Sequence, residues 1–180
     1  MNDFEFGRLP GVSQIGIGVQ DMSGAMGVYG AVFGVERWYR SKMASYEVRF
    51  KDEPTEIDWD IVVGYSGKIQ VELIRVHRAG PNLYHEALGP DGSGFHHMGF
   101  VVRDFDRRLD GVRGEGIEVL QEGSIDFAGG AGCRFAYLDT IASLGFILEI
   151  IEIRVYGLQL GMPEWLLRVG TLTGDVELVG

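Results

Sequence analysis

Apolar residues alternate with polar or small ones along two stretches of the chain that resemble each other. Residues 12–21 read VSQIGIGVQD, and residues 95–104 read FHHMGFVVRD. Aligning Gln14 with His97 brings a glycine, a valine and an aspartate of the two stretches into coincidence. Alternation with a period of two predicts a strand, and an aspartate after it can begin a helix. The repeat therefore predicts that the chain contains two copies of one structural unit.

The segments that follow the two stretches extend this repeat. Each stretch is followed by a predicted helix. The first helix has apolar residues at helical spacing over 22–33, and the second is capped by Asp104 or Asp106 and ends near Arg113. The acidic segment 51–60 is predicted to be a loop, and 77–94, with Pro81 and Pro90, separates the two halves. Predicted strands cover 12–19, 35–40, 44–50, 60–65 and 68–76 in the first half, and 95–103, 117–122, 133–139 and 144–153 in the second.

The order strand, helix and three strands thus occurs twice, which predicts one α+β domain over 1–180. Its first βαβββ module spans 12–76 and its second spans 95–153. Residues 154–180 form a C-terminal extension, for which we expect a short helix from Met162 and a short strand within 173–179.

Composition narrows the class of protein. The 180 residues include 46% hydrophobic and 23% charged residues, the balance of one globular domain. A formal net charge of -10 disfavours nucleic acid as a partner, and charges interrupt every apolar stretch short of a membrane span. Cys133 is the single cysteine, so no internal disulfide is possible. We expect a cytoplasmic protein that acts on a small molecule and binds neither nucleic acid nor membrane.

Two carboxylates interrupt apolar strands and are candidates for chemistry. Glu72 lies in QVELI and Glu149 in ILEII, each in the last predicted strand of its module. A carboxylate buried in such a strand needs a positive partner, and a divalent cation is one. Gln14 and His97 begin the first strands of the two modules. The repeat therefore suggests a cation site formed by Gln14, Glu72, His97 and Glu149, although these residues would also suit a solvated sheet face.

With these motifs in this order, residues 12–153 resemble the vicinal oxygen chelate superfamily. That superfamily includes glyoxalase I, methylmalonyl-CoA epimerase, extradiol dioxygenases and bleomycin- or fosfomycin-resistance proteins. The resemblance implies a glyoxalase-like fold, in which two modules form a curved mixed sheet around a metal cleft. It implies Gln14, Glu72, His97 and Glu149 as ligands of a metal that leaves two positions for neighbouring substrate oxygens. It also implies a homodimer, with the cleft closed either within one chain or across two.

The resemblance implies a metal-dependent lyase, isomerase or epimerase that stabilises the enolate of a small carbonyl or thioester substrate. A cation that polarises a carbonyl eases removal of the adjacent proton, and Glu149 or Glu72 would move that proton. Glutamine as the first ligand resembles eukaryotic-type glyoxalase I. Three oxygens and one imidazole suit Zn, Co, Ni, Mn or Fe(II) without choosing among them.

Two other functions remain open. A resistance-type protein would bind its ligand in the same cleft without turnover. An extradiol-type dioxygenase needs two histidines and one carboxylate around iron, and Gln14 counts against it.

Further residues have both a functional and a structural interpretation. We expect His96 to face away from His97 as a structural or pocket-lining residue, and Cys133 to belong to the core. His77 and His85 are expected at the surface, and Glu47 is either a second base or a solvated strand residue. Four arginines are candidates for holding a substrate anion, or are simply surface residues: Arg40, Arg75, Arg78 and Arg103.

Overall fold

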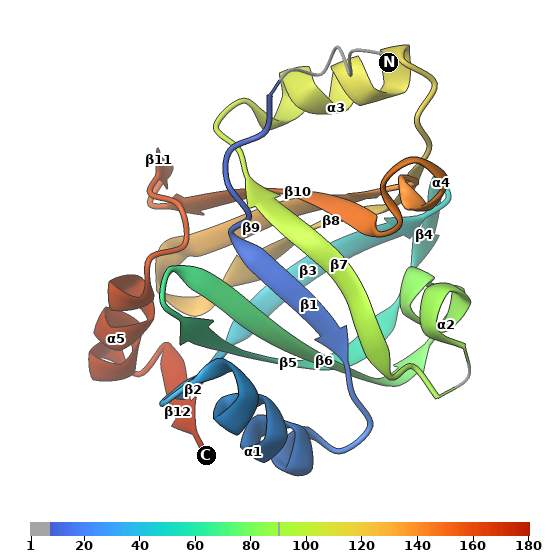
Figure 1. The fold of residues 1–180 in the computed structure, drawn as a ribbon. Coiled ribbons are helices and arrows are strands. Elements are labelled where there is room, and N and C mark those ends of the chain that lie inside the picture. Colours follow the sequence, from blue (N-terminus) through green and yellow to red (C-terminus); the bar gives the residue numbers. More distant parts are fainter. Residues whose placement is uncertain (1–7, 90) are drawn as a thin grey trace.

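A computed structural model describes residues 8–89 and 91–180. In this part of the chain one curved, mixed sheet is surrounded by helices, as Figure 1 shows, so the α+β class is confirmed. The strands run in the order β12-β2-β5-β6-β1-β7-β10-β9-β8-β3-β4, with β11 paired to β10. Their bounds are β1 (Gln14–Gly18), β2 (Trp38–Ser41), β3 (Met43–Phe50), β4 (Glu53–Thr55), β5 (Ile57–Ser66), β6 (Ile69–Ala79), β7 (Gly94–Val101), β8 (Val119–Phe127), β9 (Ala131–Leu138), β10 (Ile147–Val155), β11 (Leu158–Gln159) and β12 (Val176–Val179).

The two repeated stretches form the centre of the sheet. Strand β1 pairs parallel with β6 on one side and antiparallel with β7 on the other, and β7 pairs parallel with β10. The first strands of the two halves are therefore neighbours, and each has the last long strand of its own half beside it. This order brings β6, β1, β7 and β10, the strands that carry the four predicted ligands, next to one another.

The segment 38–50 joins the two halves in a way that the sequence repeat does not predict. Strand β2 pairs with β5 of the first half, whereas β3 pairs with β8 of the second, and only Lys42 separates β2 from β3. The cause lies in the apolar side chains of β3, because Val48 and Phe50 are buried in one cluster with Ile125 and Phe135. This crossing links the two ends of the strand order, so the sheet wraps around an interior.

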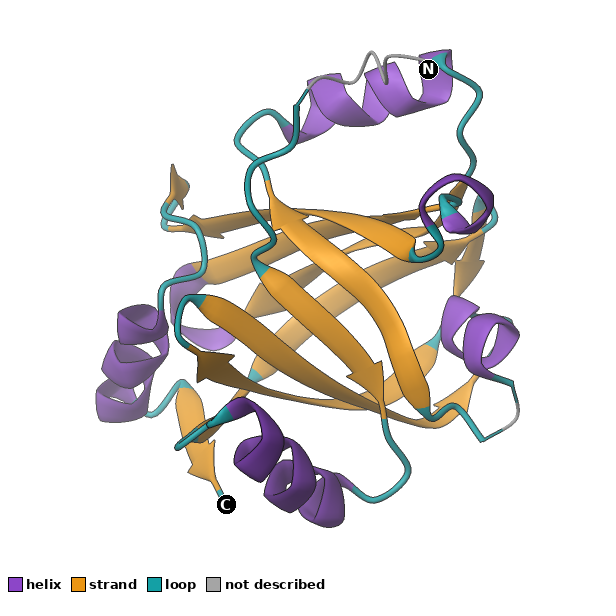
Figure 2. Ribbon diagram, in the orientation of Figure 1, coloured by secondary structure: helices purple, strands orange, loops and turns teal. Residues whose placement is uncertain are grey.

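Two of the helices pack on the outer side of this sheet, as Figure 2 shows. Helix α1 (Met22–Phe33) covers the first half through Met22, and α3 (Phe105–Gly114) covers the second through Phe105, Leu109 and Val112. The remaining helices are α2 (Leu83–Leu88), α4 (Ile141–Leu144) and α5 (Glu164–Thr173), and residues Ala128–Gly130 form a single 3-10 turn. Within residues 8–89 and 91–180, no helix has the length and apolar character needed to cross a membrane.

The structure tests three local predictions, of which it changes two and confirms one. The expected loop 51–60 contains β4 and the start of β5, because Lys51 and Asp52 adopt positive φ angles of 48° and 64° and turn the chain back on β3. The separating segment contains α2, where the Asn82 side chain accepts a hydrogen bond from the His85 amide at 3.0 Å. The helix and strand expected in the extension are confirmed as α5 and β12, and β12 pairs with β2.

Candidate functional site

The four predicted ligands meet at one nitrogen in the interior of the sheet. His97 Nε2 lies 3.2 Å from Gln14 Oε1, 3.1 Å from Glu149 Oε2 and 3.6 Å from Glu72 Oε2. His97 is completely buried, and Gln14 and Glu149 are each 4% exposed. Three residues from β1, β6 and β10 therefore direct oxygen atoms toward one imidazole nitrogen from β7.

Two glycines of the sequence repeat provide the space for this arrangement. In the antiparallel pairing of β1 with β7, Gly16 lies opposite His97 and Gly99 lies opposite Gln14. A Cβ atom on Gly16 would lie 1.9 Å from His97 Cε1, and one on Gly99 would lie 2.9 Å from Gln14 Oε1. Each half of the chain thus contributes a glycine that accommodates the polar side chain of the other half.

The carboxylates in this buried cluster have unusual electrostatics. Burial, together with the nearby Glu149 carboxylate, raises the pKa of Glu72 to about 7, although His97 acts in the opposite direction. Burial alone would lower the pKa of His97, but Glu149 and Glu72 outweigh it, so the pKa of His97 is raised. Glu149 Oε2 is fully buried and accepts no well-formed hydrogen bond, although it lies in ion-pair contact with His97 Nε2. Since Nε2 carries at most one hydrogen, it cannot satisfy three oxygen acceptors at once.

A cavity of about 280 Å³ opens above this cluster. Gln14, Glu72 and Glu149 contribute to its lining, whereas His97 lies behind them. Aromatic side chains form much of its wall, and Tyr84 and Tyr137 hold each other through hydroxyls 3.1 Å apart. The cavity is enclosed by strands of both halves and by the C-terminal extension, all within one chain.

Comparison with known proteins identifies the family. Residues 13–137 match the family model described as Glyoxalase/Bleomycin resistance protein/Dioxygenase superfamily. The chain belongs to this superfamily. The glyoxalase-like fold and the resemblance to vicinal oxygen chelate proteins are thereby confirmed. No curated protein sequence matches the chain significantly.

Several solved structures are similar to the chain. Methylmalonyl-CoA epimerase from Mycobacterium tuberculosis aligns with a TM-score of 0.54 and 16% identity, covering 88% of this chain and 92% of the epimerase. A variant of the Streptomyces coelicolor epimerase in complex with 2-nitronate-propionyl-CoA aligns with a TM-score of 0.52 and 20% identity, covering 87% of this chain and 100% of the epimerase. A hypothetical protein from Bacillus halodurans aligns with a TM-score of 0.51 and 18% identity, covering 78% of this chain and 91% of that protein. At these identities the similarity establishes the fold.

The donor set of this superfamily member fits a divalent cation. Ligands held about 2.1 Å from a cation lie roughly 3.0 to 3.4 Å apart, close to the separations of Gln14 Oε1 and Glu149 Oε2 from His97 Nε2. Glu72 lies slightly farther away, and no three His, Cys, Asp or Glu side chains in the described ranges are already spaced as a metal site. Three side-chain oxygens converge on the single nitrogen His97 Nε2, which carries at most one hydrogen, and this excess of acceptors is the observation that favours a cation.

His96 occupies a position behind His97 that the sequence did not reveal. Its Nδ1 lies 3.0 Å from His97 Nδ1, and its ring stacks on Tyr84 with centroids 4.6 Å apart. Burial, reinforced by the nearby His97, lowers the pKa of His96 well below its usual value, so His96 is neutral. A neutral His96 can accept the Nδ1 hydrogen of His97, which leaves the Nε2 lone pair of His97 directed at the site. The sequence led us to expect that His96 faces away from His97, whereas the structure brings the two rings into contact, so that His96 can orient His97.

Gln14 is held by a chain of hydrogen bonds that reaches the extension. Gln14 Nε2 donates to Gln70 Oε1 at 2.8 Å, Gln70 Nε2 donates to the Tyr65 hydroxyl at 2.8 Å, and that hydroxyl donates to the Met162 carbonyl at 2.9 Å. Because its amide nitrogen is occupied, Gln14 presents its oxygen to His97. Gln70 precedes Glu72 by two residues in the same strand, and this period-two spacing was the available signal for its role.

The other candidates lie away from the cluster. His77, His85 and Glu47 are exposed and do not line the cavity. Cys133 lines the cavity, but burial raises the pKa of its thiol well above the usual value, which does not suit a nucleophile. Arg40 is paired with Asp60 at 2.7 Å.

Proposed function

We infer that this protein is a metal-dependent isomerase, epimerase or lyase that removes a proton next to a substrate carbonyl. The observation that carries this proposal is the meeting of three side-chain oxygens, two of them from buried residues, at the buried His97 Nε2 on the floor of the cavity. Gln14, Glu72, His97 and Glu149 would hold the cation. When bound, a divalent cation would polarise the substrate carbonyl and lower the cost of removing the adjacent proton.

The two carboxylates differ in their suitability for proton transfer. The side chain of Glu72 is 13% exposed and lies 3.6 Å from His97 Nε2, whereas that of Glu149 is 5% exposed and lies 3.1 Å away. Glu72 is therefore the freer group and is the better candidate for the base, with Glu149 as a permanent ligand. A carboxylate within hydrogen-bond reach of the substrate can take the proton and return it on either face or to a neighbouring atom.

Metal analysis and isotope exchange test this proposal. The purified protein, loaded with Zn, Co, Ni, Mn or Fe(II), should bind about one ion per chain, and His97→Ala should bind far less. Loaded protein in deuterium oxide should exchange the α-proton of carbonyl and thioester compounds. Glu72→Gln should lose this exchange, and it should bind metal more weakly than wild type but more tightly than His97→Ala. The matched control is Glu47→Gln, because Glu47 is an exposed carboxylate. Gln121→Glu is unsuitable as a control, because Gln121 is buried. A protein that binds none of these ions, and whose exchange they do not improve, contradicts the proposal.

A binding protein without turnover is the second candidate, because the cavity is lined largely by apolar side chains. It requires tight ligand binding that survives chelation of the metal. An extradiol-type dioxygenase is less favoured, because the cluster contains one imidazole nitrogen and His96 approaches His97 from behind.

We also infer a homodimer. Helix α1 exposes Val28 and Val32 at 61% and 70%, which suits a face covered by a second copy. Sedimentation velocity should give twice the chain mass, and Val32→Lys should lower it, whereas a monomer at all concentrations contradicts the proposal. The four site residues already meet within one chain, so the dimer is not needed to complete the cluster.

A further inference from the structure

The charged side chains that line the cavity are all acidic. They are Glu72 and Glu149 in the floor and Asp175 near β12, and no lysine, arginine or histidine of the described ranges lines it. The walls are formed mainly by aromatic and aliphatic side chains, among them Trp59 and Phe135. A ligand that enters this cavity therefore finds no positive side chain to pair with a phosphate or a carboxylate.

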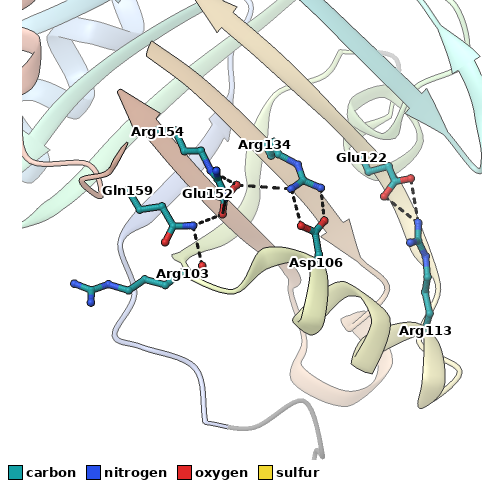
Figure 3. Close-up of polar contacts among 8 residues, drawn as sticks. All are labelled: Arg103, Asp106, Arg113, Glu122, Arg134, Glu152, Arg154 and Gln159. Atoms are coloured by element: carbon teal, nitrogen blue, oxygen red, sulfur yellow. Dashed lines mark hydrogen bonds and ion pairs between the residues drawn. The ribbon is translucent and has the colours of Figure 1, made fainter. Parts of the chain in front are cut away.

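Two arginines of the second half, Arg134 and Arg154, do not line the cavity and are paired with carboxylates. Figure 3 shows Arg134 and Arg154 beside α3, where Arg134 contacts Asp106 at 2.6 Å and Arg154 contacts Glu152 at 2.9 Å. Side chains alternate along β10, so Glu149 faces the interior and Glu152 faces these arginines. Arg134 and Arg154 thus form ion pairs on the outer surface of the sheet.

The same is true at the end of the sheet near the extension. Arg40 is paired with Asp60 at 2.7 Å and with Glu177 at 3.5 Å, and Arg168 is paired with Glu164 at 3.0 Å. These guanidinium groups are not among the residues that line the cavity.

The extension forms a fixed apolar cap on the cavity. Leu166 and Leu167 of α5 line it, and Figure 1 shows α5 beside the hairpin of β5 and β6. Tyr65 donates to the Met162 carbonyl and Tyr39 donates to Glu164 Oε1, both at 2.9 Å, so the cap is bonded to β5 and β2. This segment lies beyond residues 13–137, the part shared with the family model. Because its side chains line the cavity, the cap can set the ligand preference of this chain.

We propose that the cavity selects a neutral, largely apolar carbonyl compound with two neighbouring oxygens, and rejects compounds whose far end carries an anionic group. The inference rests on the proposed function, which places the two oxygens at the floor. A cavity of about 280 Å³ lies at the small end of ligand pockets, which suits a ligand of about a dozen non-hydrogen atoms. An aromatic or branched body of that size would pack against Trp59, Phe135 and Leu166. A coenzyme A thioester would have to leave most of its length outside.

Two ligands that differ only at the far end test this proposal. Arylglyoxal hydrates with a para-methyl or a para-carboxylate group are titrated into the protein by calorimetry, with metal present and after chelation. The methyl compound should bind about 100-fold more tightly in both states, because the carboxylate would be buried without a partner. Equal binding of the two compounds, or tighter binding of methylmalonyl-CoA than of the methyl compound, overturns the proposal.

The two states of the protein separate this proposal from the proposed function. If the metal measurements fail but the chelated protein keeps the preference for the methyl compound, the ligand class stands and the metal chemistry falls. If the metal and exchange results are positive but the preference is absent, the ligand class alone is wrong.

A charge placed in the cap provides the second test. Leu166→Lys should favour the para-carboxylate compound over the methyl compound by at least about tenfold relative to wild type, because the cavity then contains a cation. The control is Trp165→Lys, because Trp165 lies on the same helix, is 55% exposed and does not line the cavity. The proposal is wrong if folded Leu166→Lys leaves the preference unchanged or if both variants shift it equally. If Leu166→Lys does not fold, the wild-type ligand pair still decides.

Discussion

Replacing Gly16 with alanine tests the geometry of the site most directly. The new Cβ would lie 1.9 Å from Cε1 of His97 and 2.3 Å from each of its ring nitrogens. Since nonbonded carbons are comfortable at about 3.5 Å, the ring would have to retreat by roughly 1.6 Å. His97 is completely buried and lies against the rings of His96 and Tyr137, with centroids 5.3 and 5.0 Å away, so it has little room to move.

Two effects should follow from this substitution. Overpacking of this kind costs about 1–3 kcal/mol, so chemical denaturation of the metal-free protein should show a loss of that size. A displacement of more than about 1 Å also removes Nε2 from its three oxygen neighbours, so metal affinity should fall by at least the 10–100-fold typical of a disturbed ligand. Both quantities can be measured on the same preparation, by urea titration and by competition with a chromogenic chelator.

Gly27 provides the matched control for Gly16→Ala. It lies in α1, and a Cβ added there meets nothing within 4 Å. Gly27→Ala should therefore leave metal affinity unchanged and raise stability by about 0.5–1 kcal/mol, because alanine is the better helix former. A double variant adds a further check, since His97→Ala should cost less stability in the Gly16→Ala background than alone. If Gly16→Ala is as stable as wild type and binds metal equally well, the placement of His97 over Gly16 is wrong.

Three further predictions concern His96, Glu72 and the bond between Tyr65 and the extension. His96→Phe keeps a ring beside Tyr84 but loses the acceptor for His97 Nδ1, so metal affinity should fall about 10–100-fold in a chelator competition; unchanged affinity would remove its orienting role. In metal-free protein the folded pKa of Glu72 is about 7 against 4.5 for an ordinary glutamate, so stability should fall as pH rises from about 5 to 7, as urea titrations at several pH values can show. Metal binding requires the deprotonated carboxylate, so affinity should rise over the same range, and the opposite trend in either measurement contradicts the burial of Glu72. Tyr65→Phe should cost about 1 kcal/mol by removing the bond to the extension, and no loss in denaturation would argue against that anchor.

The central part of the fold could be read from the sequence because its signals are local. The alternation around Gln14 and His97 predicts two strands, and their similarity predicts that they are equivalent. Glu72 and Glu149 stand out because carboxylates are rare in apolar strands. The pairing of β1 with β7 then brings these positions together. The structure shows the proximity of these four residues, and their role as metal ligands stays a prediction.

The crossing of β3 depended on contacts that the sequence does not display. Val48 and Phe50 are apolar residues of an ordinary strand, and the neighbouring sequence gives no sign that they pack on Ile125 of the other half. The hairpin of β3 and β4 likewise depends on positive φ angles at Lys51 and Asp52, residue types that do not announce such a turn. Sequence reasoning therefore located the strands but assigned segment 51–60 to a loop.

The role of the two repeated glycines shows how one pattern can carry two kinds of information. Gly16 and Gly99 were visible as repeated positions, and strand glycines usually mark a close approach. The two glycines are needed for the same reason in opposite halves, because Gly16 makes room for His97 and Gly99 makes room for Gln14. A side chain at either position would displace a polar group contributed by the other half. The glycine and the polar residue two positions before it in each half therefore form one functional unit, and an exchange at Gly16 should affect the site as strongly as an exchange of His97 itself.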